Sequence, residues 1–323
     1  VDVSPIFHLE YEGIPVILHK TGTRWYPTWH PWPGEVVELS ISRPDGIKGR
    51  TLTIENSHLE FRPGQKTTAA SLLLSIKSSQ GGQHTITLPS NAKLQEVKIK
   101  GKIQPVRQDA RRVALPITPG HQNIEIKWLE AKGMTTRYQS SEVDLGTQSV
   151  NASVDIYLPR SRWPLFLGGE QLVGPAVLFW SVIIIIMIVA FGLAKTGWTP
   201  LRLYHWFLLG IGISMSNLAA GLIIAGWLIA LGFRKKAADF EARKFDLMQI
   251  GIAVLTIAAV SSLIFAISKG LLGHPDMNIV GNGSNSSLLR WYQDVSDHTL
   301  PQAWVFSIPM FTYRIAMLAW ALW

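Results

Sequence analysis

The sequence predicts a mixed membrane protein in which an N-terminal antiparallel β-sandwich is followed by an α-helical transmembrane bundle. Composition changes near residue 165: the first part is rich in Thr, Ser, Val, Ile, Gly and Pro, and the second in Leu, Ile, Ala, Trp and Gly. Short strand-like segments fill the first part, and long uncharged stretches fill the second. We therefore expect a β-sandwich domain over 1–165 and a transmembrane region over 166–323.

Eight segments of the first part have the alternation, or the β-branched composition, of strands. Turn sequences such as RPDG, RPGQ, SQGGQ and TPG separate many of them. Short strands at this spacing are typical of an antiparallel sandwich. The expected strands are 36–44, 50–61, 71–79, 84–89, 94–101, 111–117, 122–130 and 149–159.

Three apolar stretches of the second part are long enough to cross a bilayer. Residues 175–194 carry no charge, and at ~1.5 Å rise per residue they match a ~30 Å hydrocarbon core. We expect two more spans at 248–268 and 303–323, with a polar loop at 273–302 between them.

The stretch 206–231 is either a full span or a re-entrant pair of short helices, because its middle reads Ser-Met-Ser-Asn. The re-entrant interpretation puts basic residues 195, 202, 234, 235, 236, 243 and 244 in the cytoplasm and the β domain outside. A full span with a cytoplasmic β domain obeys the positive-inside rule equally well. We favour the first, since cysteine-free β domains on membrane stalks are common outside the cytoplasm. The predicted location is the bacterial inner membrane, with the β domain in the periplasm.

Two aromatic stretches are candidate surfaces for a partner or ligand. Rigid aromatic side chains can grip a protein or stack on a sugar. The alternatives are packing over the end of the sandwich, or anchoring at lipid headgroups. The residues are Trp25, Tyr26, Trp29, His30 and Trp32 in the first stretch, and Arg290, Trp291 and Tyr292 in the second.

Two polar residues are predicted at membrane depth. Arg314 lies about ten positions into the last expected span, where a buried charge costs at least ~2.5–3.5 kcal/mol on insertion scales. Asn217 lies in the middle of 206–231 and is a conceivable partner for it. Alternatively, the last span begins near Ile308 and Arg314 reaches the headgroups.

No sequence motif points to catalysis, a metal or a cofactor. The formal charge is +8, but no nucleic-acid-binding motif accompanies it. There is no cysteine, and the nine histidines lack the spacing of metal ligands. No GxSxG, P-loop or GxGxxG followed by a helix is present.

Several motifs resemble the membrane-proximal part of large, uncharacterised multi-domain bacterial envelope proteins of the inner membrane. They are PWPGE, GGQHTITLP, RRVALPITPG running into QNIEIKW, GNGS, RWYQD and YRIAMLAWALW. The resemblance implies exported domains before Val1 and membrane sequence after Trp323, but it supplies no activity.

The sequence favours a non-enzymatic anchor or scaffold subunit whose partners are the lipid bilayer and other envelope proteins. One alternative is a transport or channel component that uses the intramembrane polar residues. The other is an exported carbohydrate-binding module on a membrane anchor.

Overall fold

The structure, a computed structural model, describes residues 8–21, 24–42, 51–169, 173–214, 218–234 and 242–323. The chain divides into two compact units, Val1–Thr51 and Leu52–Trp323.

In the part of the first unit that the structure describes, the strands form two antiparallel pairs. Strand β1 (His8–Gly13) pairs with β4 (Val37–Ser42), and β2 (Ile17–Thr21) pairs with β3 (Arg24–Thr28). Gly13 has φ 118°, and a Cβ added there would lie 2.3 Å from the Val36 carbonyl oxygen. Only glycine allows the two strands to come this close.

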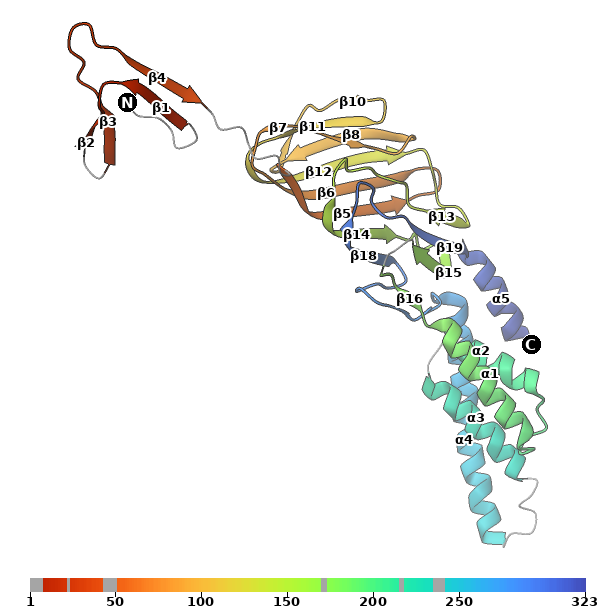
Figure 1. The fold of residues 1–323 in the computed structure, drawn as a ribbon. Coiled ribbons are helices and arrows are strands. Elements are labelled where there is room, and N and C mark those ends of the chain that lie inside the picture. The colour runs from red at the N-terminus through yellow and green to blue at the C-terminus, as the bar shows by residue number, and fades with distance from the viewer. Residues whose placement is uncertain (1–7, 22–23, 43–50, 170–172, 215–217, 235–241) are drawn as a thin grey trace. The chain divides into compact units, whose positions relative to one another are not determined.

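A seven-stranded sheet is the centre of the second unit (Figure 1). Its strand order is β18-β14-β5-β6-β12-β8-β9, and all neighbours are antiparallel except β14 and β5, which are parallel. In β6 every second side chain is buried, as expected of a strand with one face on a core. The strands are β5 (Leu52–Pro63), β6 (Thr68–Ser78), β8 (Ala92–Ile99), β9 (Lys102–Ile103), β12 (Gly120–Glu130), β14 (Ser149–Tyr157) and β18 (Leu288–Ser296).

Smaller sheets pack against the apolar face of the seven-stranded sheet. Their side chains share one hydrophobic core with it, in which Phe61, Leu115, Trp128 and Val305 are fully or almost fully buried. In the first of these sheets the strand order is β10 (Gln108–Asp109), β11 (Arg112–Ile117), β7 (Gly82–Thr87). In the second it is β13 (Arg137–Gln139), β19 (Ala303–Pro309), β15 (Arg162–Gly169). In the third, β16 (Ala176–Val177) pairs with β17 (Ile279–Val280).

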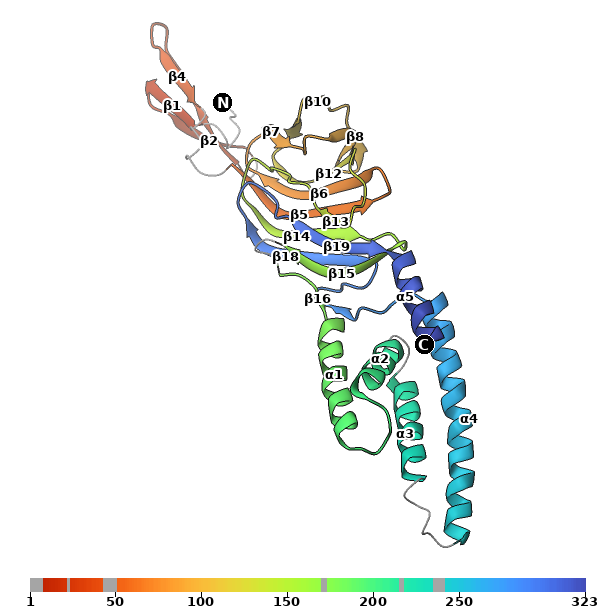
Figure 2. The same ribbon diagram turned by 90° about the vertical axis from the view of Figure 1, so that its right-hand side faces the viewer.

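The described residues of the second unit form five helices, and four of them lie between β16 and β17 in the sequence (Figure 2). Helices α1 and α5 begin inside the β core. The Trp180 indole N–H donates to the Leu165 carbonyl at 2.8 Å, and Tyr313 packs edge-on against Trp163. The helices are α1 (Phe179–Lys195), α2 (Leu203–Ser214), α3 (Leu218–Arg234), α4 (Ala242–Leu272) and α5 (Met310–Leu322).

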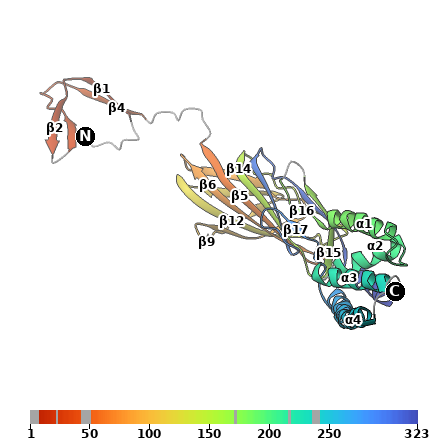
Figure 3. The ribbon, with the colours of Figure 1, turned by 90° about the horizontal axis from the view of Figure 1, so that it is seen from below.

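Helices α1 to α4 lie side by side (Figure 3). Small residues and tryptophans make several of the contacts among the helices. Gly210 of α2 lies against Ile186 of α1. Between α3 and α4, the Trp227 indole N–H donates to the Thr256 hydroxyl at 2.9 Å. The Trp320 indole of α5 donates to the Leu208 carbonyl of α2 at 2.9 Å.

The predicted fold class, an N-terminal sandwich followed by a transmembrane helical bundle, is wrong. Strands β17, β18 and β19 follow α1 to α4 and join the sheets, so the predicted polar loop 273–302 contains strands. More residues lie in strands than in helices, and the central sheet is mixed. Among the described helices, only α4, over Arg243–Leu272, is long and apolar enough to cross a membrane by length and composition.

The expected span at 303–323 is instead the strand β19 followed by the 13-residue helix α5. Hydropathy summed over a window does not distinguish a buried strand from a helix. The alternation of buried and half-buried side chains in β19 is the strand signal that the sum conceals.

The stretch 206–231 falls on two helices, α2 and α3. Residues 215–217 between them, including Asn217, lie outside the described residues. The choice between a full span and a re-entrant pair therefore stays a prediction.

Candidate functional site

A cluster of polar side chains lies on the face of the seven-stranded sheet opposite the core. It comes from the neighbouring strands β5, β14 and β18, whose register aligns Ser153 with His58 and Asp155 with Arg290. Successive side chains of a strand point to opposite faces. Val154 and Ile156 of β14 are therefore in the core, and Ser153 and Asp155 are in the polar cluster.

Asp155 and Arg290 form the centre of this cluster. Asp155 is fully buried and accepts two hydrogen bonds from the guanidinium, from Nε to Oδ1 at 2.8 Å and from Nη2 to Oδ2 at 2.6 Å. This is the bidentate geometry in which an arginine–carboxylate pair is strongest. The bond to Asp155 also raises the pKa of Arg290 above its ordinary value, so the guanidinium stays charged.

His58 and Ser153 complete the cluster. The His58 Nδ1 lies 2.7 Å from the Ser153 hydroxyl, and its Nε2 lies 3.7 Å from Asp155 Oδ2. A Ser-His-Asp triad needs the carboxylate hydrogen-bonded to the second ring nitrogen, and 3.7 Å is too long for that bond. Both Asp155 oxygens are already bonded to Arg290, so these three side chains do not make an activated nucleophile in this geometry.

A pocket of about 440 Å³ lies over the cluster. Amide, hydroxyl, imidazole and guanidinium groups line it, and the Tyr292 side chain at its edge is 42% exposed. Such a surface can hold a polar ligand or a partner's loop through several hydrogen bonds at once. The lining residues are Asn56, His58, Asn151, Ser153, Arg290, Tyr292, Gln293 and Asp294.

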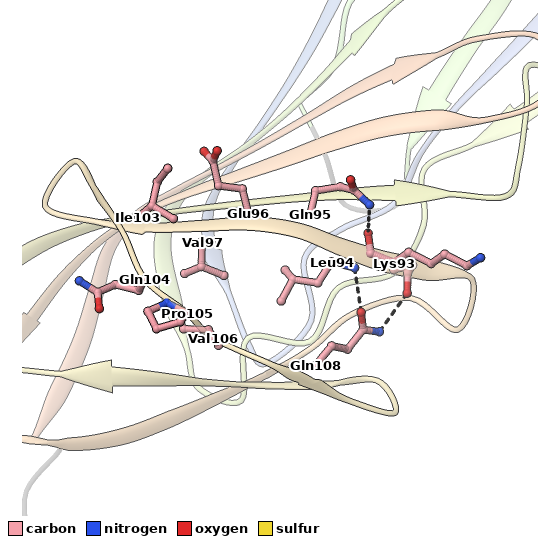
Figure 4. Close-up of a pocket in the computed structure, with 11 residues that line it drawn as sticks. Lys93, Leu94, Gln95, Glu96, Val97, Ile103, Gln104, Pro105, Val106 and Gln108 are labelled. Atoms are coloured by element: carbon pink, nitrogen blue, oxygen red, sulfur yellow. Dashed lines mark hydrogen bonds between the residues drawn. The ribbon is translucent and has the colours of Figure 1, made fainter.

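A second pocket, of about 500 Å³, lies between β8 and residues 103–108 (Figure 4). One of its polar side chains, Gln108, is engaged with the backbone: Nε2 donates to the Ala92 carbonyl at 2.9 Å, and Oε1 accepts from the Leu94 N–H at 2.8 Å. Glu96 pairs with Lys98 at 2.6 Å. The pocket over β5, β14 and β18 is the stronger candidate, because histidine, serine, aspartate and arginine side chains from three strands meet there.

The first aromatic stretch is partly a strand. Trp25 and Tyr26 lie in β3, opposite Lys20 and His19 of β2. The side chains of Trp25 and Tyr26 lie outside the part of the chain that the structure describes.

The remaining residues of that stretch differ in how much surface they present. Trp29 packs edge-on against Tyr11, with ring centroids 5.3 Å apart. Trp32 is 76% exposed, and its backbone N–H donates to Glu35 Oε2 at 2.9 Å within a turn. His30 is also exposed. Trp32 and His30 are therefore the described members of this stretch that are most available to a partner.

The second aromatic stretch divides between the two faces of β18. Trp291 is 1% exposed and belongs to the hydrophobic core. Arg290 is bound to Asp155, whereas Tyr292 is exposed at the pocket edge. Of the three predicted contact residues, Trp291 has no surface to offer.

Arg314 is exposed on α5. This helix has 13 residues, about 20 Å at the rise of an α-helix, which is shorter than a bilayer core. Its intramembrane role, like that of Asn217, stays a prediction.

Sequence reasoning missed His58, Ser153 and Asp155. His58 and Ser153 are 95 positions apart, and only the β14–β5 pairing joins them. One local signal was present: Asp155 stands in the strand-like run SVDIYL, where a carboxylate surrounded by apolar residues requires a buried partner.

Comparisons with known proteins do not identify a family. No family model matches the chain, and no curated protein matches it. Among solved structures, an M1 zinc metallopeptidase from Deinococcus radiodurans is 11% identical with a TM-score of 0.30 and covers 39% of this chain. The same peptidase bound to a Tyr-Ser-Ala substrate is 12% identical with a TM-score of 0.29 and covers 38% of this chain.

This chain spans about a third of those peptidases' length, 36% and 35% respectively. At such scores the likeness carries no argument about fold or activity. Within the described residues, no group of three or more His, Cys, Asp or Glu side chains could hold a metal ion.

Proposed function

We propose that the protein is a non-enzymatic envelope component of the bacterial inner membrane, an anchor or scaffold subunit of a larger assembly with its β domain in the periplasm. The observation that carries the proposal is the amount of apolar side-chain surface that the helices leave uncovered.

Large aliphatic side chains on α1 and α4 point away from the protein. Ile188 of α1 is 65% exposed, and Ile257 and Ile264 of α4 are 70% and 63% exposed. Apolar surface left in water costs ~25 cal/mol per Å², and large continuous patches of it mark membrane or protein contacts. At ~1.5 Å per residue, α4 extends about 45 Å, more than a ~30 Å hydrocarbon core.

The connections of α4 support the proposed orientation. Its C-terminal end, at Leu272, leads into β17 of the β domain, and its first turns carry Arg243 and Lys244. If α4 crosses the membrane, these charges and the β domain lie on opposite sides, and the positive-inside rule then favours a β domain outside the cytoplasm. Labelling of a single cysteine at Ala69, an exposed position on β6, with an impermeant reagent in intact cells measures this orientation directly.

The helices are attached to the sheets in a way that would hold the β domain firmly at a membrane. The α1 residue Phe179 is buried in the β core, and the Met310 N–H at the start of α5 donates to the Ser161 carbonyl at 2.8 Å. Two helices that start within the core fix the β domain more firmly than a Gly/Ser tether would. The polar pocket then offers a partner a surface in a defined orientation.

Arginine at the middle of α4 is expected to reduce membrane insertion. The change Ile257→Arg should lower the insertion equilibrium about 100-fold, because a central arginine costs ~2.5–3.5 kcal/mol on insertion scales. Carbonate extraction of cell membranes measures the effect. The matched control is Leu247→Arg, near the N-terminal end of α4 and also exposed, where the side chain can snorkel to the interface. Equal retention of both variants would contradict a membrane-spanning α4.

The scaffold role predicts that the protein is isolated with partners. Purification of the full chain in mild detergent after brief crosslinking in cells should give complexes larger than one chain. The double change Trp32→Ala and Tyr292→Ala should reduce their yield severalfold, since exposed aromatic residues dominate many contact energies. Recovery of a single uncomplexed chain from both samples would rule out the scaffold role.

A further inference from the structure

The helices α1, α2 and α3 enclose an apolar groove of about 380 Å³. Its walls include Ile185 and Val189 of α1 and Leu222 of α3, which are 59%, 53% and 67% exposed. Gly210 lies in its lining, and a Cβ there would come within 2.5 Å of the Ile186 Cγ2. Glycine at this position therefore allows α1 and α2 to approach closely beside the groove.

The chemistry of the lining restricts what the groove can hold. Apart from the Trp206 indole, its one polar side chain is Ser214. The Ser214 hydroxyl donates to the Ile211 carbonyl of its own helix at 2.7 Å. A sugar, nucleotide or peptide would leave its own polar groups unpaired there, at a cost of ~1–3 kcal/mol for each. A hydrocarbon chain has no such groups.

The charges next to the groove indicate the headgroup. Lys195 ends α1, two residues beyond the lining residue Leu193, and its side chain is exposed. Arg202 is also exposed, and its carbonyl accepts a hydrogen bond from the N–H of the lining residue Trp206, one turn further on. Two cations beside a hydrocarbon groove complement a lipid whose headgroup is an anionic phosphate.

We propose that this groove binds one acyl chain of an anionic phospholipid, with the phosphate held at Lys195 and Arg202. The proposal rests on the proposed membrane location. The bound lipid would be an integral part of the helix packing, because it covers side chains of three helices at once.

Native mass spectrometry of the full chain in detergent, titrated with phosphatidylglycerol or with phosphatidylcholine of the same acyl chains, tests the proposal. We expect one tightly retained phosphatidylglycerol and binding of phosphatidylcholine at least tenfold weaker. Changing both Lys195 and Arg202 to glutamine should remove the preference for phosphatidylglycerol, because each charge contributes roughly fivefold to its binding. Equal retention of the two lipids by the unmodified protein would overturn the proposal.

A substitution that fills the groove supplies the second test. Ala225 lines the groove, so Ala225→Phe should abolish retention of the lipid. Ala253→Phe, the same change at an exposed position of α4, should leave retention intact. Equal effects of the two changes would overturn the proposal.

A third measurement does not depend on variants, so it also covers a failure of Ala225→Phe to fold. Phosphatidylglycerol with a photoactivatable acyl chain should crosslink within 182–225, and crosslinks confined to the outer face of α4 would overturn the site. Carbonate extraction distinguishes a failure of lipid binding from a failure of the proposed membrane location. A protein that stays in membranes but binds no lipid selectively contradicts only the lipid-binding groove.

Discussion

Replacing Arg290 by glutamine is expected to destabilise the β domain by about 3–5 kcal/mol, the usual cost of leaving one member of a buried ion pair unpaired. Asp155 is fully buried, and both of its oxygens accept from the Arg290 guanidinium. Without that partner, the carboxylate either stays charged in a low-dielectric environment or takes up a proton. Urea unfolding at neutral pH, followed by amide hydrogen exchange of β14, measures the loss.

Replacing Asp155 should lower the free energy of unfolding by less than replacing Arg290, because the Arg290 side chain is the more exposed of the two. The Arg290 side chain is 29% exposed, against 0% for Asp155, so a guanidinium without its carboxylate can turn towards water. We expect Asp155→Asn to cost about 1–3 kcal/mol. The double change Asp155→Asn with Arg290→Gln should be more stable than Arg290→Gln alone, since no buried charge is left unpaired. A double variant that is no more stable than Arg290→Gln would show that the buried charge is not the cause.

The positions of many strands could be predicted from the sequence, whereas their order could not. The expected strands at 50–61, 71–79 and 122–130 correspond to β5, β6 and β12. Alternation is a local property and can be read within ten residues. The parallel pairing of β14 with β5 depends on packing between segments about 95 residues apart, which no local pattern encodes.

In the helical half of the chain, by contrast, the sequence predicted the wrong kind of element at one place. Strong apolarity at 303–309 suggested a membrane helix, but these residues complete a sheet between β13 and β15. A buried strand and a membrane segment both exclude polar side chains, so total hydropathy gives the same answer for each. The signals that distinguish them are the period of two and the Pro309 that precedes α5, since proline suits a helix entrance and not a helix interior.

The candidate site could be predicted only in part, because its side chains come from strands that are far apart in the sequence. Arg290 and Tyr292 stood out because they flank a tryptophan in a short aromatic run. Their partners His58, Ser153 and Asp155 are ordinary strand residues by local criteria. They meet only because β14 lies between β5 and β18 in the sheet.

The adjacent residues Trp291 and Tyr292 should respond very differently to alanine. Trp291 is 1% exposed in the core, and a Cβ added at Gly174 would lie 2.4 Å from its Cδ1, so the ring packs directly on backbone. Trp291→Ala should therefore cost about 3–5 kcal/mol of unfolding free energy, through lost burial and the cavity left behind. Tyr292→Ala, on the exposed face, should cost less than ~1 kcal/mol and act on partner binding instead. Urea unfolding and crosslinking yield, measured on both variants, separate the two roles. If Trp291→Ala kept full stability and lost partners, the side chain would be a contact residue and the packing described for β18 would be incorrect.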